Sequence, residues 1–323
     1  MNFYTNILET VGNTPLVKLN HITRGIRATV LAKLEFLSPG GSLKDRVAFH
    51  MLRDVEESGI IKPGDTIVEE TSGNTGIGLG IYAAIKGYKV IVVTTDRTSD
   101  EKCDILKALG VKIIICPKEA PPESPEYCRN VAKRIAEMTP NVYFIDQLFN
   151  EKNVESHYRT TGPEIWEQTE HKVDIVVIGI GTGGTISGVG KYLKERNPQI
   201  RVIGVDPVGS VMYDYFKGKK ITTPSPYLVE GIGGKIIPFI MNFEVVDDII
   251  QVTDKDTFLM TRRLLKEEGI FAGGSSGAAV WGALQVAKAA EEGKIVVTIL
   301  PDRGHNYLSK IYNDEWMTGK ELI

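Results

Sequence analysis

Short apolar runs recur along this chain, and most of them lead into a segment with the periodicity of a helix. The runs occupy residues 28–36, 66–71, 89–95, 111–117, 142–147, 173–181, 201–207 and 294–302. Several are apolar almost without interruption, which is typical of parallel strands covered by helices on both faces. The alternation predicts an α/β fold with open, mainly parallel, twisted sheets and helices on both faces. Because these strands are too many for one compact sheet, we expect two sheet domains.

Helices are predicted between the strands. The segments with helical periodicity are residues 44–59, 76–87, 100–110, 183–197 and 275–293. Gly110 ends one of them after periodic apolar positions, as glycine commonly does. Two irregular stretches, 117–127 and 217–228, are rich in proline, charged or small polar residues and are predicted to be surface loops.

Bulk properties argue against several classes of protein. The 323 residues carry a net charge of -3 at pH 7, so nothing indicates nucleic acid or an anionic membrane as a partner. No apolar run approaches the roughly 20 residues that span a bilayer, and the first residues lack the basic and apolar regions of a secretory signal. The cysteines have no C-x-x-C spacing and the histidines no metal-ligand spacing. We expect a cytoplasmic protein with reduced thiols and no metal site.

The run at residues 173–181 ends in a glycine-rich loop that admits two interpretations. Its glycines have the spacing G-x-G-x-x-G of a dinucleotide-binding loop: Gly179, Gly181 and Gly184. Asp206 ends the following strand, which also suits a dinucleotide. The hydroxyls of Thr182 and Thr185, together with backbone amides at a helix N-terminus, suit a single terminal phosphate instead. This motif alone does not distinguish the two.

A second loop, SPGGSLKDR at residues 38–46, places Lys44 at the start of an amphipathic helix. A lysine in the first turn of a helix is most often simply solvated. Its charge opposes the helix dipole, however, and a partly desolvated amine at this place would have a lowered pKa. A lowered pKa is what a lysine that forms a Schiff base requires. Lys44 is therefore a candidate nucleophile.

Two further loops have the same strand–glycine–helix form. ETSGNTGIGLG at residues 70–80 crowds short polar side chains around Gly73, and FAGGSSGAA at residues 271–279 precedes a late helix. The first of these could surround a carboxylate with amides and hydroxyls. Such loops and a candidate reactive lysine together indicate a phosphorylated cofactor, a carboxylate-bearing substrate and covalent amine chemistry. That combination fits pyridoxal phosphate better than NAD.

The motifs PGGSLKDR, ETSGNTGIGL, GIGTGGTISG and GGSSG occur in this order along the chain. In this the chain resembles, over nearly its whole length, the fold-type II pyridoxal phosphate enzymes of the cysteine synthase and cystathionine β-synthase family. GVDPVGS, VEGIG and LPDRGHNYLSK with NDEWM are more similar to the cystathionine β-synthase branch. The resemblance implies a smaller N-terminal α/β domain at residues 39–145 and a larger α/β domain made of residues 1–38 and 146–323. The cofactor is expected in the cleft between them.

The resemblance also implies a role for each matching residue. Lys44 is expected to form the internal aldimine and then to move the α-proton. Asn74 would hydrogen-bond the hydroxyl of the pyridine ring, and Ser275 would face the ring nitrogen. The remaining expected contacts are with the cofactor phosphate (Gly181, Thr182, Gly183, Gly184 and Thr185), with the substrate carboxylate (Thr71, Ser72, Gly73, Thr75 and Gln147) and beside the amino-acid substrate (Glu230 and Gly231).

The activity that the resemblance implies is β-replacement on an amino acid by a thiol. Serine, O-acetylserine or cysteine would donate the β-carbon, and cysteine as donor would release hydrogen sulfide. Homocysteine as the thiol would make the enzyme a cystathionine β-synthase, whereas sulfide would make it a cysteine synthase. The enzymes of this group are often homodimers, so a homodimer is expected. The alternatives are a serine or threonine dehydratase, a non-catalytic regulatory relative and an NAD-dependent dehydrogenase.

Three positions depart from the family pattern. Glu70 stands where the family usually has proline, Leu148 where cystathionine β-synthases commonly have tyrosine, and Gly234 where a bulkier residue is frequent. The missing phenol at position 148 leaves the choice between homocysteine and sulfide open. The missing side chain at position 234 is expected to widen the entrance to the site.

Overall fold

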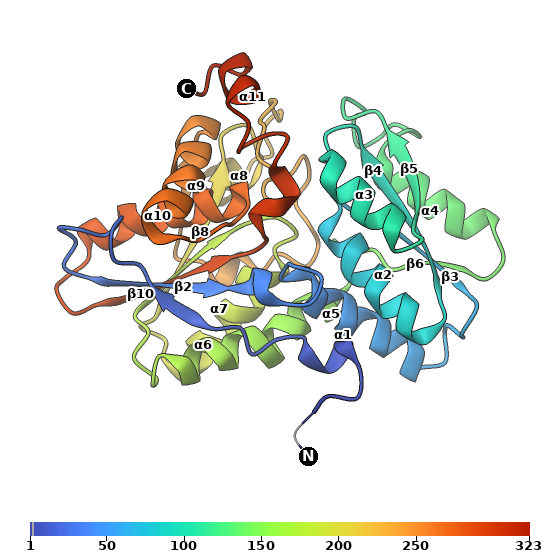
Figure 1. The fold of residues 1–323 in the computed structure, drawn as a ribbon, viewed down its shortest axis with the longest axis horizontal. Helices are drawn as coiled ribbons and strands as arrows, with labels where there is room; N and C mark the ends of the chain where they lie inside the picture. Colours follow the sequence, from blue (N-terminus) through green and yellow to red (C-terminus); the bar gives the residue numbers. More distant parts are fainter. Residues whose placement is uncertain (2) are drawn as a thin grey trace.

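The structure, a computed structural model, describes Met1 and residues 3–323 and contains two β-sheets (Figure 1). The larger sheet has the strand order β1-β2-β10-β7-β8-β9 and the smaller one the order β5-β4-β3-β6. Neighbouring strands are parallel except β1 and β2, which pair antiparallel. The strands are Leu16–Lys18 (β1), Thr29–Leu34 (β2), Thr66–Glu70 (β3), Lys89–Thr95 (β4), Lys112–Cys116 (β5), Val142–Phe144 (β6), Ile175–Gly179 (β7), Arg201–Pro207 (β8), Asp248–Val252 (β9) and Ile295–Leu300 (β10).

Helices surround both sheets (Figure 1). The α-helices are Lys44–Glu57 (α1), Asn74–Lys86 (α2), Asp100–Ala108 (α3), Cys128–Met138 (α4), Glu151–Ser156 (α5), Gly162–Gln168 (α6), Gly184–Arg196 (α7), Met212–Gly218 (α8), Asp254–Glu268 (α9), Gly274–Ala289 (α10) and Asp314–Gly319 (α11). A π-helical turn, His157–Thr161 (η3), joins α5 to α6. Short 3-10 turns lie at Ile7–Thr10 (η1), Glu35–Leu37 (η2), Phe243–Val245 (η4) and Gly304–Tyr307 (η5).

The central strands are buried on both faces. Val177 of β7 packs into one apolar cluster and its neighbour Val176 into another, on the opposite face of the larger sheet. In the smaller sheet, Ile67 and Val68 of β3 likewise belong to different clusters. Because every residue of such a strand meets apolar surroundings, the strands read as continuous apolar runs in the sequence.

The predicted α/β fold with two mainly parallel sheets is confirmed, and each predicted strand and helix is present. The apolar pattern misses β1 and β9, which form the two edges of the larger sheet. β1 has three residues and is mostly exposed, while β9 begins with Asp248 and also contains the half-buried Gln251. These two strands have a neighbour on one side only and contain exposed or polar residues, so they lack the continuous apolar run on which the prediction depends.

The smaller sheet uses residues between 66 and 144, and the larger sheet uses residues 16–34 and 175–300. The division into domains at 39–145, and at 1–38 with 146–323, stays a prediction. Loops that leave the carboxyl ends of β7 and β10 emerge at the same edge of the larger sheet, because these strands are parallel neighbours. Ligands of open α/β sheets commonly bind at this edge.

Candidate active site

Lys44 is the first residue of α1, directly behind the turn that the sequence SPGGS forms. Gly41 has a φ of +78° in this turn, and the backbone N–H of Leu43 donates to the carbonyl of Pro301 (2.8 Å) at the end of β10. The Lys44 side chain is half-buried. Within the described residues its amine has no hydrogen-bond or ion-pair partner. Burial lowers the pKa of Lys44 to about 8, and the carboxyl of Glu69 offsets part of that shift.

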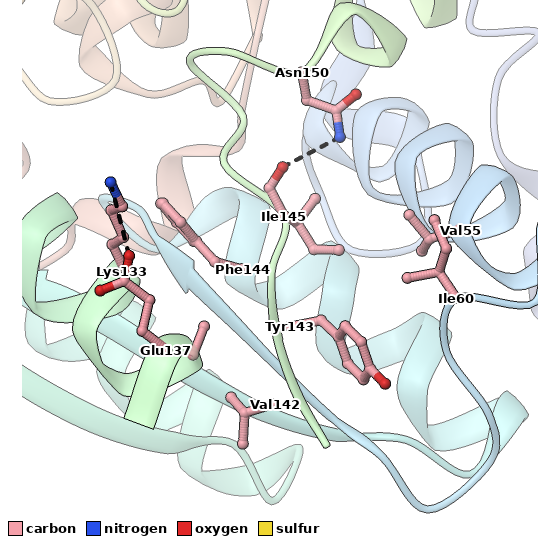
Figure 2. A pocket seen from close by; sticks show the side chains of 10 residues that line it. Val55, Ile60, Lys133, Glu137, Val142, Tyr143, Phe144, Ile145 and Asn150 are labelled. Atoms are coloured by element: carbon pink, nitrogen blue, oxygen red, sulfur yellow. Dashed lines mark hydrogen bonds and ion pairs between the residues drawn. The ribbon is translucent and has the colours of Figure 1, made fainter. Parts of the chain in front are cut away.

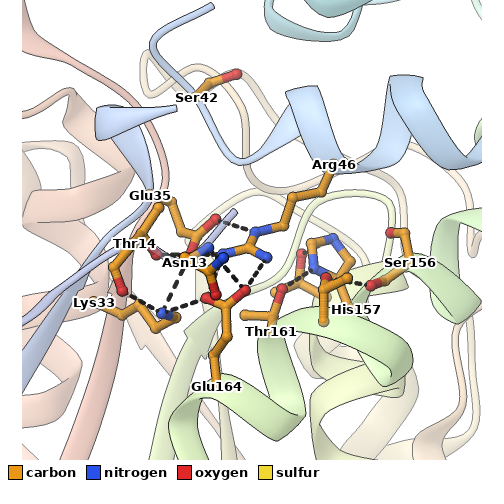
Figure 3. A network of polar contacts seen from close by, with 12 residues as sticks. Asn13, Thr14, Lys33, Glu35, Ser42, Arg46, Ser156, His157, Thr161 and Glu164 are labelled. Carbon is orange, nitrogen blue, oxygen red and sulfur yellow. Dashed lines mark hydrogen bonds and ion pairs between the residues drawn. The ribbon is translucent and has the colours of Figure 1, made fainter. Parts of the chain in front are cut away.

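A buried ion cluster fixes the first turn of α1 (Figure 3). Arg46 donates to Glu35 (Nε–Oε2 2.7 Å) and to Glu164 of α6 (Nη1–Oε1 2.6 Å). Lys33 of β2 also contacts Glu164 (Nζ–Oε2 2.7 Å). Burial alone would raise the pKa of Glu164, but its bonds with Arg46 and Lys33 lower it to about 2. Because Arg46 lies two positions after Lys44, the cluster anchors the backbone of the turn from which the Lys44 side chain extends.

The loop at residues 71–75 joins β3 to α2. Gly73 has a φ of +113°, and a Cβ on it would lie 2.9 Å from the Lys102 side chain, so the turn requires glycine. Thr71 is buried and its Oγ1 accepts a bond from the N–H of Gly73 (3.1 Å), whereas Ser72 is exposed. Backbone amides and short hydroxyls at the start of a helix are suited to a carboxylate.

Gln147 and Asn153 connect this loop to the one at residues 181–185. The side chain of Gln147 accepts from the Thr75 hydroxyl (2.8 Å) and donates to the carbonyl of Glu70 (2.8 Å). Asn153 of α5 donates to the backbone carbonyl of Gln147 (2.9 Å) and to Thr182 Oγ1 (3.1 Å). The Thr75 hydroxyl is therefore committed to Gln147, and a continuous chain of hydrogen bonds runs between the two loops.

The loop at residues 181–185 ends β7 and opens α7. A Cβ on Gly181 would lie 2.5 Å from the carbonyl oxygen of Gly231, and Gly183 has a φ of +83°. Only glycine satisfies both the close approach and the left-handed turn without strain. Thr182 and Thr185 are half-buried. Backbone amides and two hydroxyls at the N-terminus of a 13-residue helix fit a phosphate dianion.

Asp206, which the dinucleotide interpretation needs for a ribose, is committed elsewhere. It is fully buried, and its Oδ2 accepts from the backbone N–H of Tyr213 in the first turn of α8 (3.0 Å). Desolvation raises the pKa of Asp206 to about 6. Because this carboxyl caps a helix and does not reach solvent, the loop at residues 181–185 fits one phosphate better than a dinucleotide.

Asn74, the first residue of α2, is buried among polar side chains from the end of β10. Its Nδ2 donates to Asp302 Oδ2 (2.8 Å), and its Oδ1 accepts from Asn306 (3.4 Å). Asp302 Oδ2 also accepts from the hydroxyl of Tyr307 (2.6 Å). Among the described residues the second N–H of the Asn74 amide has no acceptor, so it can donate to a ligand, as a ring hydroxyl would require.

Glu230 is held by two lysines. Lys102 of α3 contacts its Oε2 (2.9 Å) and Lys310 its Oε1 (2.6 Å), and Lys310 also donates to the carbonyl of Arg97 (2.6 Å). Burial opposes ionisation of Glu230, but the charges of Lys102 and Lys310 lower its pKa. Both carboxylate oxygens are paired, so Glu230 can position its loop but is not a free base.

Ser275 is buried in the first turn of α10, and a Cβ on Gly231 would lie 3.8 Å from its hydroxyl. Backbone hydrogen bonds tie this loop and the Lys44 loop to the residues after β10: Gly273 donates to the carbonyl of Asp302 (2.9 Å), and Arg303 donates to the carbonyl of Gly41 (3.2 Å). A cavity of about 440 Å³ lies elsewhere, between β6, α4 and the end of α1 (Figure 2), and no predicted site residue lines it. Asn150 on its rim donates to the carbonyl of Ile145 (3.1 Å).

Several residues that contact the predicted site residues are not themselves predicted as site residues: Lys102, Asn153, His157, Asp302 and Lys310. Lys102 does carry a signal, since it lies four positions before Leu106 on the buried face of α3. A charged residue on an apolar stripe indicates a buried partner. The other four carry no such signal in the sequence.

The three cysteines are free thiols. In the part of the chain that the structure describes, no group of three or more histidine, cysteine or acidic side chains is arranged to hold a metal ion. No described helix has both the length and the apolar character needed to cross a bilayer.

Residues 7–302 match the family model described as pyridoxal-phosphate dependent enzyme. A cystathionine beta-synthase of Dictyostelium discoideum is 46% identical over 318 residues, which cover 98% of this chain and 64% of that protein. A cysteine synthase of Staphylococcus aureus is 44% identical over 94% of this chain and 95% of its own length. The crystal structure of a hydrogen sulfide-producing enzyme from Fusobacterium nucleatum matches with a TM-score of 0.88 and 34% identity, covering 95% of this chain and 100% of that one.

The chain spans less than two thirds of the cystathionine beta-synthases that it resembles, 64% of the Dictyostelium protein and 57% of the rat protein. It spans nearly the whole of the Staphylococcus cysteine synthase. The family resemblance drawn from the four glycine motifs is confirmed, and so is the cofactor that they indicate. The chain belongs to the family of pyridoxal-phosphate dependent enzymes.

Proposed function

We propose that the protein catalyses β-replacement on serine, O-acetylserine or cysteine with a thiol, in the manner of a cystathionine β-synthase. The observation that carries the proposal is the Lys44 amine, which has no partner within the described residues and a pKa lowered to about 8. Lys44 stands at the start of α1, and this helix packs against α2. The first residue of α2 is Asn74, which belongs to the loop at residues 71–75. With this pKa about a tenth of the amine is uncharged at pH 7, far more than for an ordinary lysine, and the uncharged amine can act as nucleophile and then as base.

The residues of the site fit pyridoxal phosphate. Gly181 to Thr185 would hold its phosphate, Asn74 its ring hydroxyl and Ser275 its ring nitrogen. When bound, this cofactor supplies an aldehyde for amines and a ring that withdraws electrons from the α-carbon. Ser275 offers a neutral hydroxyl, not a carboxylate, so it does not hold a proton on the ring nitrogen. This favours early loss of a leaving group from the β-carbon.

Lys44 would remove the proton from the α-carbon of the amino acid and later return it. The loop at residues 71–75 would hold the substrate carboxylate through backbone amides and the exposed Ser72 hydroxyl, with the second amide hydrogen of Gln147. Glu230 is paired with Lys102 and therefore supports the loop beside the substrate without taking a proton.

Cysteine synthase activity, with sulfide as the nucleophile, is the second candidate. Leu148 supports it, since this half-buried aliphatic side chain follows Gln147 and offers no phenol to an incoming homocysteine. The Staphylococcus cysteine synthase, which this chain matches over almost its full length, supports it as well. Release of hydrogen sulfide from cysteine is consistent with either candidate.

Three further expectations stay predictions. They concern the small-molecule partners, which would be an amino acid and a thiol, the homodimer, and a location in the cytoplasm. Each requires its own measurement: substrate profiling, the mass of the particle in solution, and fractionation of cells.

The visible absorption spectrum of the purified protein tests the proposal. Serine, O-acetylserine or cysteine would be added in turn, followed by homocysteine or sulfide. A cofactor band that changes with one amino acid and returns with one thiol would support β-replacement and identify the pair. Formation of pyruvate with no effect of any thiol would indicate a dehydratase, and absence of any band after addition of pyridoxal phosphate would refute catalysis.

A further inference from the structure

Both hydroxyls of the loop at residues 181–185 are contacted from one neighbouring segment, α5 and the π-helical turn that follows it. Asn153 of α5 contacts Thr182 (Nδ2–Oγ1 3.1 Å), and His157 of the π-turn contacts Thr185 (Nε2–Oγ1 3.2 Å). Asn153 and His157 are fully buried. A buried polar side chain that reaches a ligand-binding hydroxyl can determine whether this hydroxyl donates or accepts.

The surroundings of His157 determine which of its nitrogens carries the proton. Burial, reinforced by the charges of Lys44 and Arg46, holds the pKa of His157 well below its usual value, so the ring is neutral. Its Nδ1 lies 2.9 Å from the hydroxyl of Thr161 (Figure 3), which is fully buried. Within the described residues Nδ1 is the only partner of that hydroxyl.

A proton on Nδ1 would leave the buried Thr161 hydroxyl with no acceptor for its own proton, which is costly. Thr161 therefore donates to Nδ1, and the ring proton resides on Nε2. From Nε2 it is donated to Thr185 Oγ1. The hydroxyl proton of Thr185 is then free to point into the site.

Asn153 likewise makes the Thr182 hydroxyl a hydrogen-bond acceptor. Its amide nitrogen faces both the carbonyl oxygen of Gln147 (2.9 Å) and Thr182 Oγ1, so both amide hydrogens are donated. A flipped amide would place its oxygen against the carbonyl oxygen of Gln147 and is excluded. Thr182 therefore accepts from Asn153, and its own proton is free as well.

We propose that Asn153 and His157 are positioning residues that turn the hydroxyl protons of Thr182 and Thr185 toward the phosphate of pyridoxal phosphate. A phosphate dianion only accepts hydrogen bonds, so each hydroxyl must donate to bind it. Such charge-assisted bonds are stronger than neutral ones. The inference concerns binding of the cofactor and does not depend on which amino acid or thiol reacts.

The first test reads the tautomer directly. The holoenzyme is labelled with ¹⁵N in its histidines, and the His157 resonances are assigned from a His157→Gln sample. A neutral ring with the proton on Nε2 is expected in the presence of bound cofactor. A proton on Nδ1, or a charged ring at pH 7, would overturn the proposal for His157.

The second test removes the Thr161 hydroxyl, which does not itself touch the cofactor. The dissociation constants of pyridoxal phosphate and of pyridoxal, which lacks the phosphate, are compared for the wild type, Thr161→Val and Thr161→Ser. The preference for the phosphorylated form is expected to fall about tenfold in Thr161→Val, the effect of one weakened charge-assisted bond, and to stay within about twofold in Thr161→Ser.

An equal loss of affinity for both compounds in Thr161→Val would mean a merely structural role and would overturn the proposal, as would an unchanged preference. If Thr161→Val does not fold, Asn153→Asp provides the same comparison. Its carboxylate would accept the Thr182 proton and should lower the preference for the phosphorylated form by more than tenfold. An Asn153→Asp preference equal to that of the wild type would refute the role of Asn153.

Discussion

The loops at residues 71–75 and 181–185 have the same form, a glycine turn between a strand and a helix, but they use their polar side chains differently. In the first loop, Thr75 donates its hydroxyl proton to Gln147, whereas Thr71 accepts from the Gly73 amide and has no acceptor for its own proton among the described residues. In the second, side chains of α5 and the π-turn support Thr182 and Thr185 from outside. The first loop can therefore offer the hydroxyls of Thr71 and Ser72 to a carboxylate without side-chain support, whereas the second offers two hydroxyls that neighbouring side chains hold.

The largest effect is expected from Lys44→Ala, which leaves both loops intact and removes the proposed nucleophile and base. Turnover should fall by on the order of 10³-fold or more, because nucleophile and base are lost together. The temperature of unfolding should stay the same, since the amine has no partner in the described structure. Rates from steady-state kinetics and a thermal melt check this, and substantial activity in this variant would remove Lys44 from the mechanism.

Gly181→Ala should distort the loop at residues 181–185, which we propose holds the phosphate, and leave the loop at residues 71–75 unchanged. The added Cβ would lie 2.5 Å from the carbonyl oxygen of Gly231, so the loop must move. Its backbone amides would then no longer point toward the phosphate position. The affinity for pyridoxal phosphate is expected to fall about 100-fold, the equivalent of one or two charge-assisted hydrogen bonds. Gly218→Ala is the control, because a Cβ at that position meets nothing within 4 Å. Equal cofactor affinities in the two variants would contradict the assignment.

Gln147→Ala should affect the loop at residues 71–75, which we propose holds the substrate carboxylate, and leave the loop at residues 181–185 unchanged. The substitution removes the side chain that accepts a hydrogen bond from the Thr75 hydroxyl. It keeps the backbone carbonyl that accepts a hydrogen bond from Asn153. We expect the KM of the amino acid to rise about tenfold, roughly one hydrogen bond to a charged group, with unchanged affinity for the cofactor. Titration of the cofactor alongside the kinetics separates the two, and a loss of cofactor affinity alone would show that the loops are not independent in this way.

The pH dependence of cofactor uptake tests whether Lys44 is the amine that reacts with the cofactor. Only the neutral amine attacks an aldehyde, and burial lowers the pKa of Lys44 to about 8. The rate at which cofactor-free protein takes up pyridoxal phosphate should therefore rise about tenfold from pH 7 to pH 9 and level off above that. Stopped-flow absorbance measures it. A rate that still climbs steeply between pH 9 and pH 10 would indicate an ordinary, solvated lysine.

The smallest effect on activity is expected from Leu148→Tyr, at the position that follows Gln147 in the chain. A phenol there should raise the use of homocysteine relative to sulfide by a few-fold, about the worth of one hydrogen bond. Leu148→Phe supplies the ring without the hydroxyl and serves as the control. If both variants shift the ratio equally, size and not hydrogen bonding determines the choice of thiol.

The sequence predicts the sheets and the glycine loops well, because each is encoded locally, and the role of Lys44 stays a prediction. A continuous apolar run, a glycine spacing and a lysine at a helix start can each be read from about ten neighbouring residues. The support of the site is different. Asn153 contacts Thr182 across 29 positions, and Asn74 contacts Asp302 across 228. No local pattern encodes such pairs, so the residues that orient the ligand-binding groups emerge only from the structure.

The strand order of the larger sheet has a consequence for how the chain can fold. β10, the last strand in sequence, pairs with β2 on one side and with β7 on the other. Until residues 295–300 have been synthesised, β2 and β7 lack the neighbour that joins them, and each keeps an open strand edge. The smaller sheet needs no residue after Phe144. Synthesis from the N-terminus would thus permit the smaller sheet to form early, whereas the larger sheet must wait for its centre, and during that wait its edges are open to aggregation.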